Sequence, residues 1–213
     1  WRRNGLDAAG LLTEAARECD AALQADDKDL EARRALAYLD RRRGRLSEAL
    51  GGFTAVLAET PDNVDALLGL AEVNLTRHSR GEDPQAFDAA VAAARRAAQI
   101  EPAFWKVPFT LARILYGGEQ LDAAIAAAED SVRLDPNVLA LSNLGSFQFC
   151  KGNLVDARAA YERARQADPA TFVGEAQLGV VMYFQREFAQ AARLFKTALD
   201  LQARGGKPEV HRL

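Results

Sequence analysis

Histidine and cysteine are scarce in this chain of 213 residues, which contains only two of each. His78 and His211 lie far apart, and Cys19 and Cys150 form no CxxC or CxxH grouping. Zinc sites and thiol–histidine catalytic pairs need such residues in clusters or in partnership. The sequence therefore predicts no metal site, and it favours two packed or partly exposed thiols.

Nucleotide loops and long apolar runs are missing too. No GxxxxGK[ST] or GxGxxG sequence occurs, and the pairs Gly51-Gly52 and Gly117-Gly118 suit helix starts and turns better than a phosphate loop. No stretch is apolar for long enough to span a membrane. We therefore expect no cofactor, no membrane contact within this segment and no enzymatic activity from it.

An excess of charge of one sign is also lacking. The 27 Lys and Arg residues nearly balance the 30 Asp and Glu residues, which leaves a formal net charge of -3. Proteins that bind DNA or RNA normally carry a dominant basic field, so direct nucleic-acid binding is not expected. Two unpaired cysteines suit a reducing cytoplasm, while a periplasmic location is left open.

What the chain does have is a period. Pro102, Pro136 and Pro169 recur at nearly equal intervals, and each of these prolines follows an acidic residue. Pro61 precedes Pro102 by one such interval plus an insertion of about seven residues. Proline cannot continue a helix and restricts the residue before it, so each acidic-Pro step predicts the end of a helix.

The residues between these prolines repeat in phase. One unit carries Leu144-Gly145 in its first helix and Ala157 and Tyr161 in its second; the next carries Leu178-Gly179 and Phe195. This pattern resembles the tetratricopeptide repeat, whose signature combines a Leu-Gly pair, an Ala followed by a large aromatic residue, and a closing Pro, with a period of about 34 residues. The small residues stand where paired helices must approach closely.

The resemblance implies an all-α fold, a right-handed superhelical solenoid of antiparallel helix pairs. Residues 1–29 are expected to form an N-terminal helix, the second helix of a truncated repeat. Asp83-Pro84 is expected to restart a helix after an inserted loop, as N-cap and first helical residue. Five repeats are predicted at about 30–63, 64–104 (with a loop insertion at 77–83), 105–137, 138–171 and 172–205, followed by a tail, 206–213, that could start a further repeat.

In this family the first helices of successive units line a concave groove that holds an extended or helical peptide. When the family's inward-facing positions are carried over to each unit, the expected groove is basic at its N-terminal end, has the amide of Asn143 in its middle and is aromatic beyond. Two alternatives remain: the arginines could simply face water, and Tyr183 and Phe184 could pack against a missing sixth unit. The expected groove residues are Arg34, Tyr38, Arg41, Glu72, Lys106, Phe109, Arg113, Asn143, Ser146, Phe149, Gln177, Val180 and Tyr183.

The function implied is a protein–protein interaction module for a protein or peptide partner. The repeats resemble those of bacterial signalling proteins such as Ser/Thr kinases and transcriptional regulators, where they act as docking or sensory regions. Two alternatives stay open. The array could be a structural spacer that self-associates through its ends, or an accessory region of an enzyme whose catalytic domain lies outside this chain.

Overall fold

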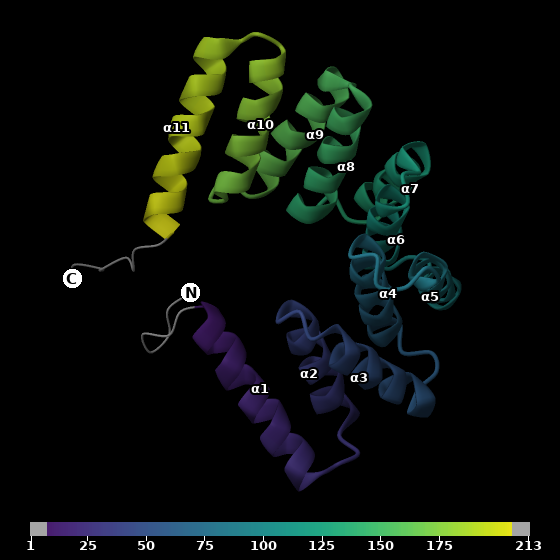
Figure 1. Cartoon of the computed structure of the whole chain (residues 1–213). Coiled ribbons are helices and arrows are strands. Elements are labelled where there is room, and N and C mark those ends of the chain that lie inside the picture. The colour runs from purple at the N-terminus through teal and green to yellow at the C-terminus, as the bar shows by residue number, and fades with distance from the viewer. Residues whose placement is uncertain (1–7, 206–213) are drawn as a thin grey trace, which may run out of the picture. The chain divides into compact units, whose positions relative to one another are not determined.

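The computed structural model describes residues 8–205, which contain eleven α-helices and no strand (Figure 1). The predicted all-α class is confirmed. The chain divides into two compact units, Trp1–Gly118 (unit 1) and Glu119–Leu213 (unit 2). The helices are α1 (Ala8–Ala25), α2 (Leu30–Arg42), α3 (Leu46–Glu59), α4 (Val64–Ser79), α5 (Ala86–Ile100) and α6 (Lys106–Gly117) in unit 1, and α7 (Leu121–Leu134), α8 (Val138–Lys151), α9 (Leu154–Ala167), α10 (Phe172–Phe184) and α11 (Phe188–Gly205) in unit 2.

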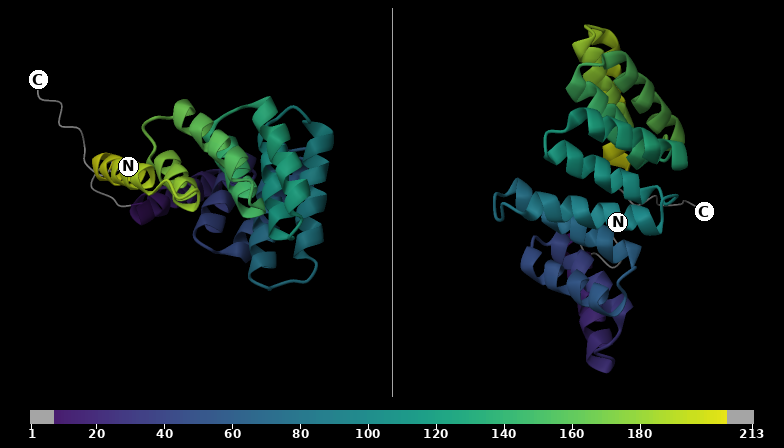
Figure 2. Two further views of the ribbon diagram at one scale, coloured as in Figure 1. Left: turned by 90° about the horizontal axis from the view of Figure 1, so that it is seen from above. Right: turned by 90° about the vertical axis from the view of Figure 1, so that its right-hand side faces the viewer.

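Within each unit, every helix packs against the helices before and after it in the chain, as in a helical solenoid (Figure 2). In unit 1, α4 also lies beside both α2 and α6. Among the described residues, no helix combines the length and apolar character needed to cross a membrane. The possible further repeat at 206–213 lies outside the described residues.

Short polar residues fix where four of the helices that open a pair begin: α2, α4, α8 and α10. The side chains of Asp29 and Asn63 accept hydrogen bonds from backbone N–H groups in the first turns of α2 and α4, each at 2.9 Å. Asn137 does the same at α8, and Thr171 at α10. Such caps satisfy N–H groups that have no partner within the helix, and each contributes about 1 kcal/mol.

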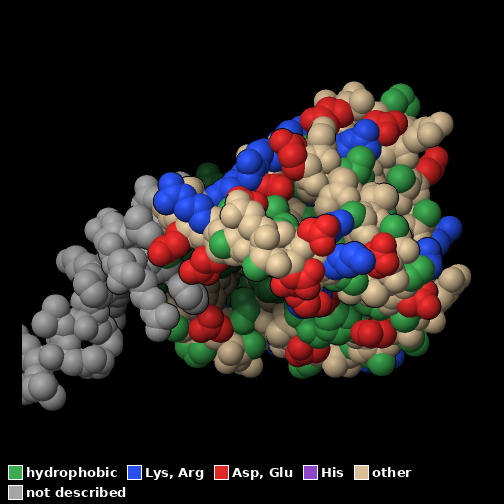
Figure 3. Space-filling view, turned by 90° about the horizontal axis from the view of Figure 1, so that it is seen from below, with side chains coloured by type: hydrophobic (Ala, Val, Ile, Leu, Met, Phe, Trp, Pro, Cys, Tyr) green, Lys and Arg blue, Asp and Glu red, His purple; other side chains and the backbone are tan. Residues whose placement is uncertain are grey.

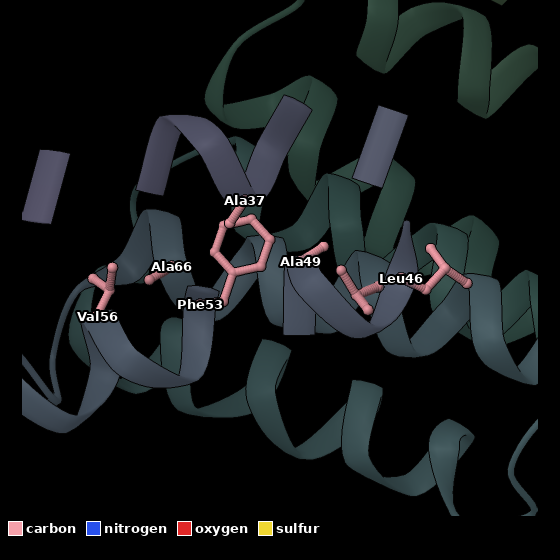
Figure 4. Close-up of a cluster of buried hydrophobic side chains, with 7 residues drawn as sticks. Ala37, Leu46, Ala49, Phe53, Val56 and Ala66 are labelled. Atoms are coloured by element: carbon pink, nitrogen blue, oxygen red, sulfur yellow. The ribbon is translucent and has the colours of Figure 1, made fainter. Parts of the chain in front are cut away.

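The core of unit 1 is organised around Phe53 of α3. Its side chain is completely buried among Ala37, Ala49 and Val56 (Figure 4). Its ring also lies against Gly69 of α4, where an added Cβ would stand 2.3 Å from a ring carbon. Because only glycine leaves room for the ring, this contact sets how closely α4 can approach α3.

Tyr161 of α9 has the corresponding role in unit 2. Its ring lies against Gly145 of α8, where an added Cβ would be 2.6 Å away, and it packs with Leu178 and Val181 of α10. One aromatic side chain therefore joins three successive helices. Phe195 of α11 lies in the same way against Gly179, but it remains 36% exposed because no described helix of unit 2 covers its outer side.

The inserted loop differs from the expectation. Helix α4 continues to Ser79, and α5 begins at Ala86 after Gln85, so Asp83 is not the N-cap of the helix. The Asp83 carboxylate instead accepts a hydrogen bond from the Gln85 N–H at 2.8 Å and pairs with Arg77 at 3.0 Å. No Gly or Pro interrupts the chain between the middle of α4 and Gly81, so nothing prevents α4 from extending by another turn.

Two glycines within helices provide a test of this packing. Gly69→Ala should lower the free energy of unfolding by about 1–3 kcal/mol, because its new methyl group collides with the buried Phe53 ring. Gly51→Ala is the matched control. Its Cβ would meet nothing within 4 Å, so the higher helix propensity of alanine should stabilise the protein by about 0.5–1 kcal/mol. Urea denaturation followed by circular dichroism measures both, and a shift of both variants in one direction would contradict the assignment.

Candidate peptide-binding faces

Unit 1 presents the expected residues of its first helices on one surface, the α2–α4–α6 face. The face includes Arg34, Tyr38 and Arg41 of α2, Asp65 and Glu72 of α4, and Lys106, Phe109 and Arg113 of α6. Since α4 lies beside both α2 and α6, side chains from all three helices can meet there. The structure brings most of them into direct contact.

Charged side chains on this face form a ladder of ion pairs, here called the ion-pair ladder. Arg34 pairs with Asp65 on α4 and with Glu31 on its own helix. Glu72 is shared between two helices, since it accepts from Arg41 of α2 at 2.8 Å and from Arg113 of α6 at 2.6 Å. The Glu72 side chain is only 15% exposed, so removing its charge would cost more than breaking a typical surface bridge.

Tyr38 is part of the same network. Its hydroxyl donates to the backbone carbonyl of Asp65 at 2.7 Å. Burial raises the pKa of the Tyr38 hydroxyl, and the nearby carboxylates of Asp65 and Glu72 act in the same direction. The hydroxyl therefore remains protonated and keeps donating across the gap between α2 and α4.

The ion-pair ladder shows that the N-terminal end of the expected groove does not carry free positive charge. The sequence predicts a basic end from Arg34 and Arg41, but both guanidinium groups are already paired with carboxylates of α4, as is that of Arg113 in α6. In the view of Figure 3, both acidic and basic side chains are spread over the surface. An acidic ligand would have to displace Asp65 or Glu72 to reach these arginines.

The remaining expected residues of unit 1 lie at α6. The ammonium group of Lys106 lies 5.4 Å from the ring centre of Phe104, and the guanidinium of Arg113 lies 5.8 Å from that of Phe109. Phe109 also packs edge-on against Trp105, with ring centres 5.5 Å apart. These contacts give Phe109 a packing role and leave Lys106 exposed at the start of the helix.

Unit 2 presents the other six expected residues on the α8–α10 face. They are Asn143, Ser146 and Phe149 of α8, and Gln177, Val180 and Tyr183 of α10. The Ser146 hydroxyl is not available, because it donates to the carbonyl of Ser142 at 2.9 Å and lies 3.0 Å from the Tyr161 hydroxyl. Ser146 therefore stabilises the helix pair.

Aromatic rings of α8 and α10 contact one another on this face. The Phe149 ring lies 5.1 Å from that of Phe184 in an edge-to-face arrangement, and Phe184 lies 5.8 Å from Tyr183. Tyr183 is 55% exposed and Phe184 59%. Val180 is also exposed, so this part of the face offers apolar surface to a ligand.

Two amides on the same face have polar atoms without partners. The Asn143 Nδ2 donor and the Gln177 Oε1 acceptor are both shielded from solvent, and neither has a hydrogen-bond partner within the described part of the chain. Buried polar groups are nearly always paired, because leaving one unpaired costs about 1–3 kcal/mol. One donor and one acceptor on successive first helices match the groups that a peptide backbone supplies.

Sequence reasoning placed the helices and faces but missed several contacts. Phe188 was not expected on this face; it extends the exposed aromatic surface of Tyr183 and Phe184, with the rings of Tyr183 and Phe188 5.5 Å apart. Only the local cluster of aromatic residues from Tyr183 to Phe188 hinted at it. Among residues 8–205 there is no group of three or more His, Cys, Asp and Glu side chains that could hold a metal ion. The chemistry that these faces offer is hydrogen bonding and apolar contact.

Comparison with known proteins identifies the same repeats. A family model described as tetratricopeptide repeat matches residues 34–103 and 109–170. Among curated proteins, the chain is 35% identical over 129 residues to the protein CTR9 homolog of Arabidopsis thaliana, an alignment that covers 59% of this chain and 11% of that protein. The chain thus spans about a tenth of the length of this relative.

Solved structures show the same fold. TTC0263, a thermophilic TPR protein of Thermus thermophilus, matches with a TM-score of 0.77 and 20% identity over 83% of this chain and 93% of its own. YrrB, described as a TPR protein with an unusual peptide-binding site, matches with a TM-score of 0.57 and 18% identity over 88% of this chain and 94% of its own. At these identities the likeness concerns the fold.

The shared carboxylate of Glu72 provides a test of the ion-pair ladder. Glu72→Gln should lower the free energy of unfolding by about 1–3 kcal/mol, because it leaves two partly buried guanidinium groups without their counterion. Asp62→Asn is the matched control, since the Arg96–Asp62 pair is exposed and long at 3.3 Å, and its loss should change stability by less than about 0.5 kcal/mol. Equal effects in urea denaturation would show that Glu72 has no special role.

Proposed function

The chain belongs to the tetratricopeptide repeat family, and we propose that it is a protein-interaction module that holds a peptide segment of its partner on the α8–α10 face. Repeats of this kind typically bind other proteins, and we propose no catalytic role for this segment. A docking or sensory role within a larger protein is part of the proposal. The match to a plant relative about five times longer supports it, while the bacterial signalling context stays a prediction.

The observation that carries the proposal is the pair of unsatisfied amides. A peptide strand laid across α8 and α10 would offer a carbonyl to Asn143 Nδ2 and an N–H to Gln177 Oε1. Both atoms have almost no solvent-accessible surface, so the two amide groups would turn outward to meet the strand. The hydrogen bonds formed there would end the cost of leaving these groups unpaired. Backbone recognition of this kind gives affinity without fixing the ligand's sequence.

The neighbouring apolar side chains would supply selectivity. Phe149, Val180 and Tyr183 lie on the same face as the amides, so apolar side chains of the ligand would contact them. In the ion-pair ladder of unit 1, Arg34 and Arg41 are already paired with carboxylates, and Arg41 Nε is its one shielded side-chain atom without a partner among the described residues. The ladder therefore offers a peptide one unpaired donor and no unpaired acceptor. The ligand is therefore expected to be apolar in character rather than acidic.

Removal of either amide tests the proposal. A display library of short random peptides would be selected on the wild-type protein, and the Kd of a selected peptide would be measured by isothermal titration calorimetry. Asn143→Ala and Gln177→Ala should each weaken binding about five- to a hundredfold, which corresponds to about 1–3 kcal/mol for a shielded hydrogen bond. Neither change should unfold the protein, since neither atom has a partner within the described residues.

The matched control is Gln166→Ala, which removes an exposed amide from α9 and should leave Kd unchanged. Circular dichroism would confirm that all three variants are folded. Two outcomes would overturn the proposal: the library yields no binder, or the selected peptide binds both amide variants and the control as tightly as the wild type.

A further inference from the structure

The outer surface of α11 carries an apolar stripe that meets the aromatic surface of the α8–α10 face only at Phe188, beside Tyr183. Phe188, Ala192, Phe195 and Leu199 follow one another at intervals of four, three and four residues, so they share one face of the helix. All four are exposed, Leu199 by 65% and Phe188 by 57%. In unit 2, α11 packs on α10, and no further described helix of this unit covers its other side (Figure 1).

The chain itself shows how such a surface looks when a helix covers it. Tyr161 of α9 stands one repeat before Phe195, and it is nearly buried because α10 lies over it. The covering segment also forms ion pairs with α9: Arg158 pairs with Glu187 at 3.2 Å and Arg165 with Glu175 at 3.8 Å. The covered surface of α9 is therefore partly ionic.

The corresponding positions of α11 are apolar. In the register that aligns Tyr161 with Phe195, Ala192 is the equivalent of Arg158 and Leu199 is the equivalent of Arg165. A helix surface that only met water would be expected to keep or gain charge at such positions. The outer surface of α11 is instead more apolar than the covered surface of α9, which is typical of an interaction site.

Charge beside the stripe indicates the kind of occupant. On one side of the stripe, Lys196 lies next to it and Arg193 lies further round the helix; both are exposed, and neither forms an ion pair within residues 8–205. Asp200 is the single acidic residue on that border. A second copy packed antiparallel by the same stripe would bring the two basic borders together, which costs free energy. An acidic border on the partner would complement them.

We propose that the α11 stripe docks an amphipathic helix of a partner protein that has small and aliphatic residues on its apolar face and acidic residues along its border. Gly69 against Phe53 in unit 1 shows why small residues fit, because a glycine on the covering helix lets an aromatic ring seat fully. The same geometry would bury Phe195, which is 36% exposed without a partner.

A pair of synthetic helices tests the proposal. The first probe is a peptide of about 18 residues with Leu, Ala and Gly on its apolar face and Glu on its borders, long enough to cover the ~17 Å from Phe188 to Leu199 at 1.5 Å per residue. Its twin carries Lys in place of each Glu. Fluorescence anisotropy with the full chain should show the Glu peptide binding at least about tenfold more tightly than its twin.

Variants of α11 then locate the binding. The double change Arg193→Glu/Lys196→Glu should reverse the preference between the two peptides, and Leu199→Gln should weaken the Glu peptide about tenfold. Val155→Gln on α9 is the matched control, because Val155 is 75% exposed and outside the stripe, and it should change neither affinity. Thermal unfolding should have the same midpoint in all variants.

Other occupants give different results, and each would overturn the proposal. A dimer in sedimentation velocity that Leu199→Gln dissociates would assign the stripe to a second copy. A lower thermal midpoint for Leu199→Gln without peptide binding would show that the stripe is covered from within the chain. Binding to phosphatidylserine vesicles in place of either peptide would assign it to a membrane. Equal binding of the two peptides would remove the charge argument.

Discussion

The contact on which the helix packing depends is an aromatic ring seated on a residue without a side chain. Phe53 is completely buried because Gly69 leaves room for it, and Tyr161 is nearly buried because Gly145 does the same. Each contact brings two helix backbones closer than any larger residue would allow. The distance between helices, and hence which side chains can meet on the exposed faces, follows from these few positions.

The ion-pair ladder is one consequence of that closeness. Glu72 can accept from Arg41 and Arg113 only because α4 lies beside both α2 and α6. Sharing one carboxylate between two flanking helices ties together three helices that are not consecutive in sequence. The same feature that stabilises unit 1 therefore removes from its face the free positive charge that a ligand could use.

The sequence predicted the helices and their packing positions well, because both follow from a period. Leu144-Gly145 and Tyr161 could be placed from the resemblance to the tetratricopeptide signature, and all three residues are buried as their positions require. Pairing could not be predicted in this way. Arg34 and Asp65 belong to different repeats, and nothing in a periodic pattern states which carboxylate a given arginine will choose. The pattern alone therefore predicts free arginines, and the peptide-contact residues stay predictions for the same reason.

The two exposed surfaces of unit 2 differ in the kind of contact that a bound partner would supply. On the α8–α10 face, Asn143 and Gln177 lack hydrogen bonds that any peptide backbone could supply, so the demand is polar and directional. On α11, what is missing is cover for Phe195 and Leu199, which is apolar and non-directional. In a repeat protein the two surfaces can be compared with other parts of the same chain, because every position has equivalents in the other repeats. Arg158 of α9 has an acidic partner, whereas the equivalent position of α11 is the uncharged Ala192. This difference between equivalent positions indicates that the two helix surfaces contact different things. The repeated part of the pattern thus specifies the fold, and the departures from it carry the information about binding.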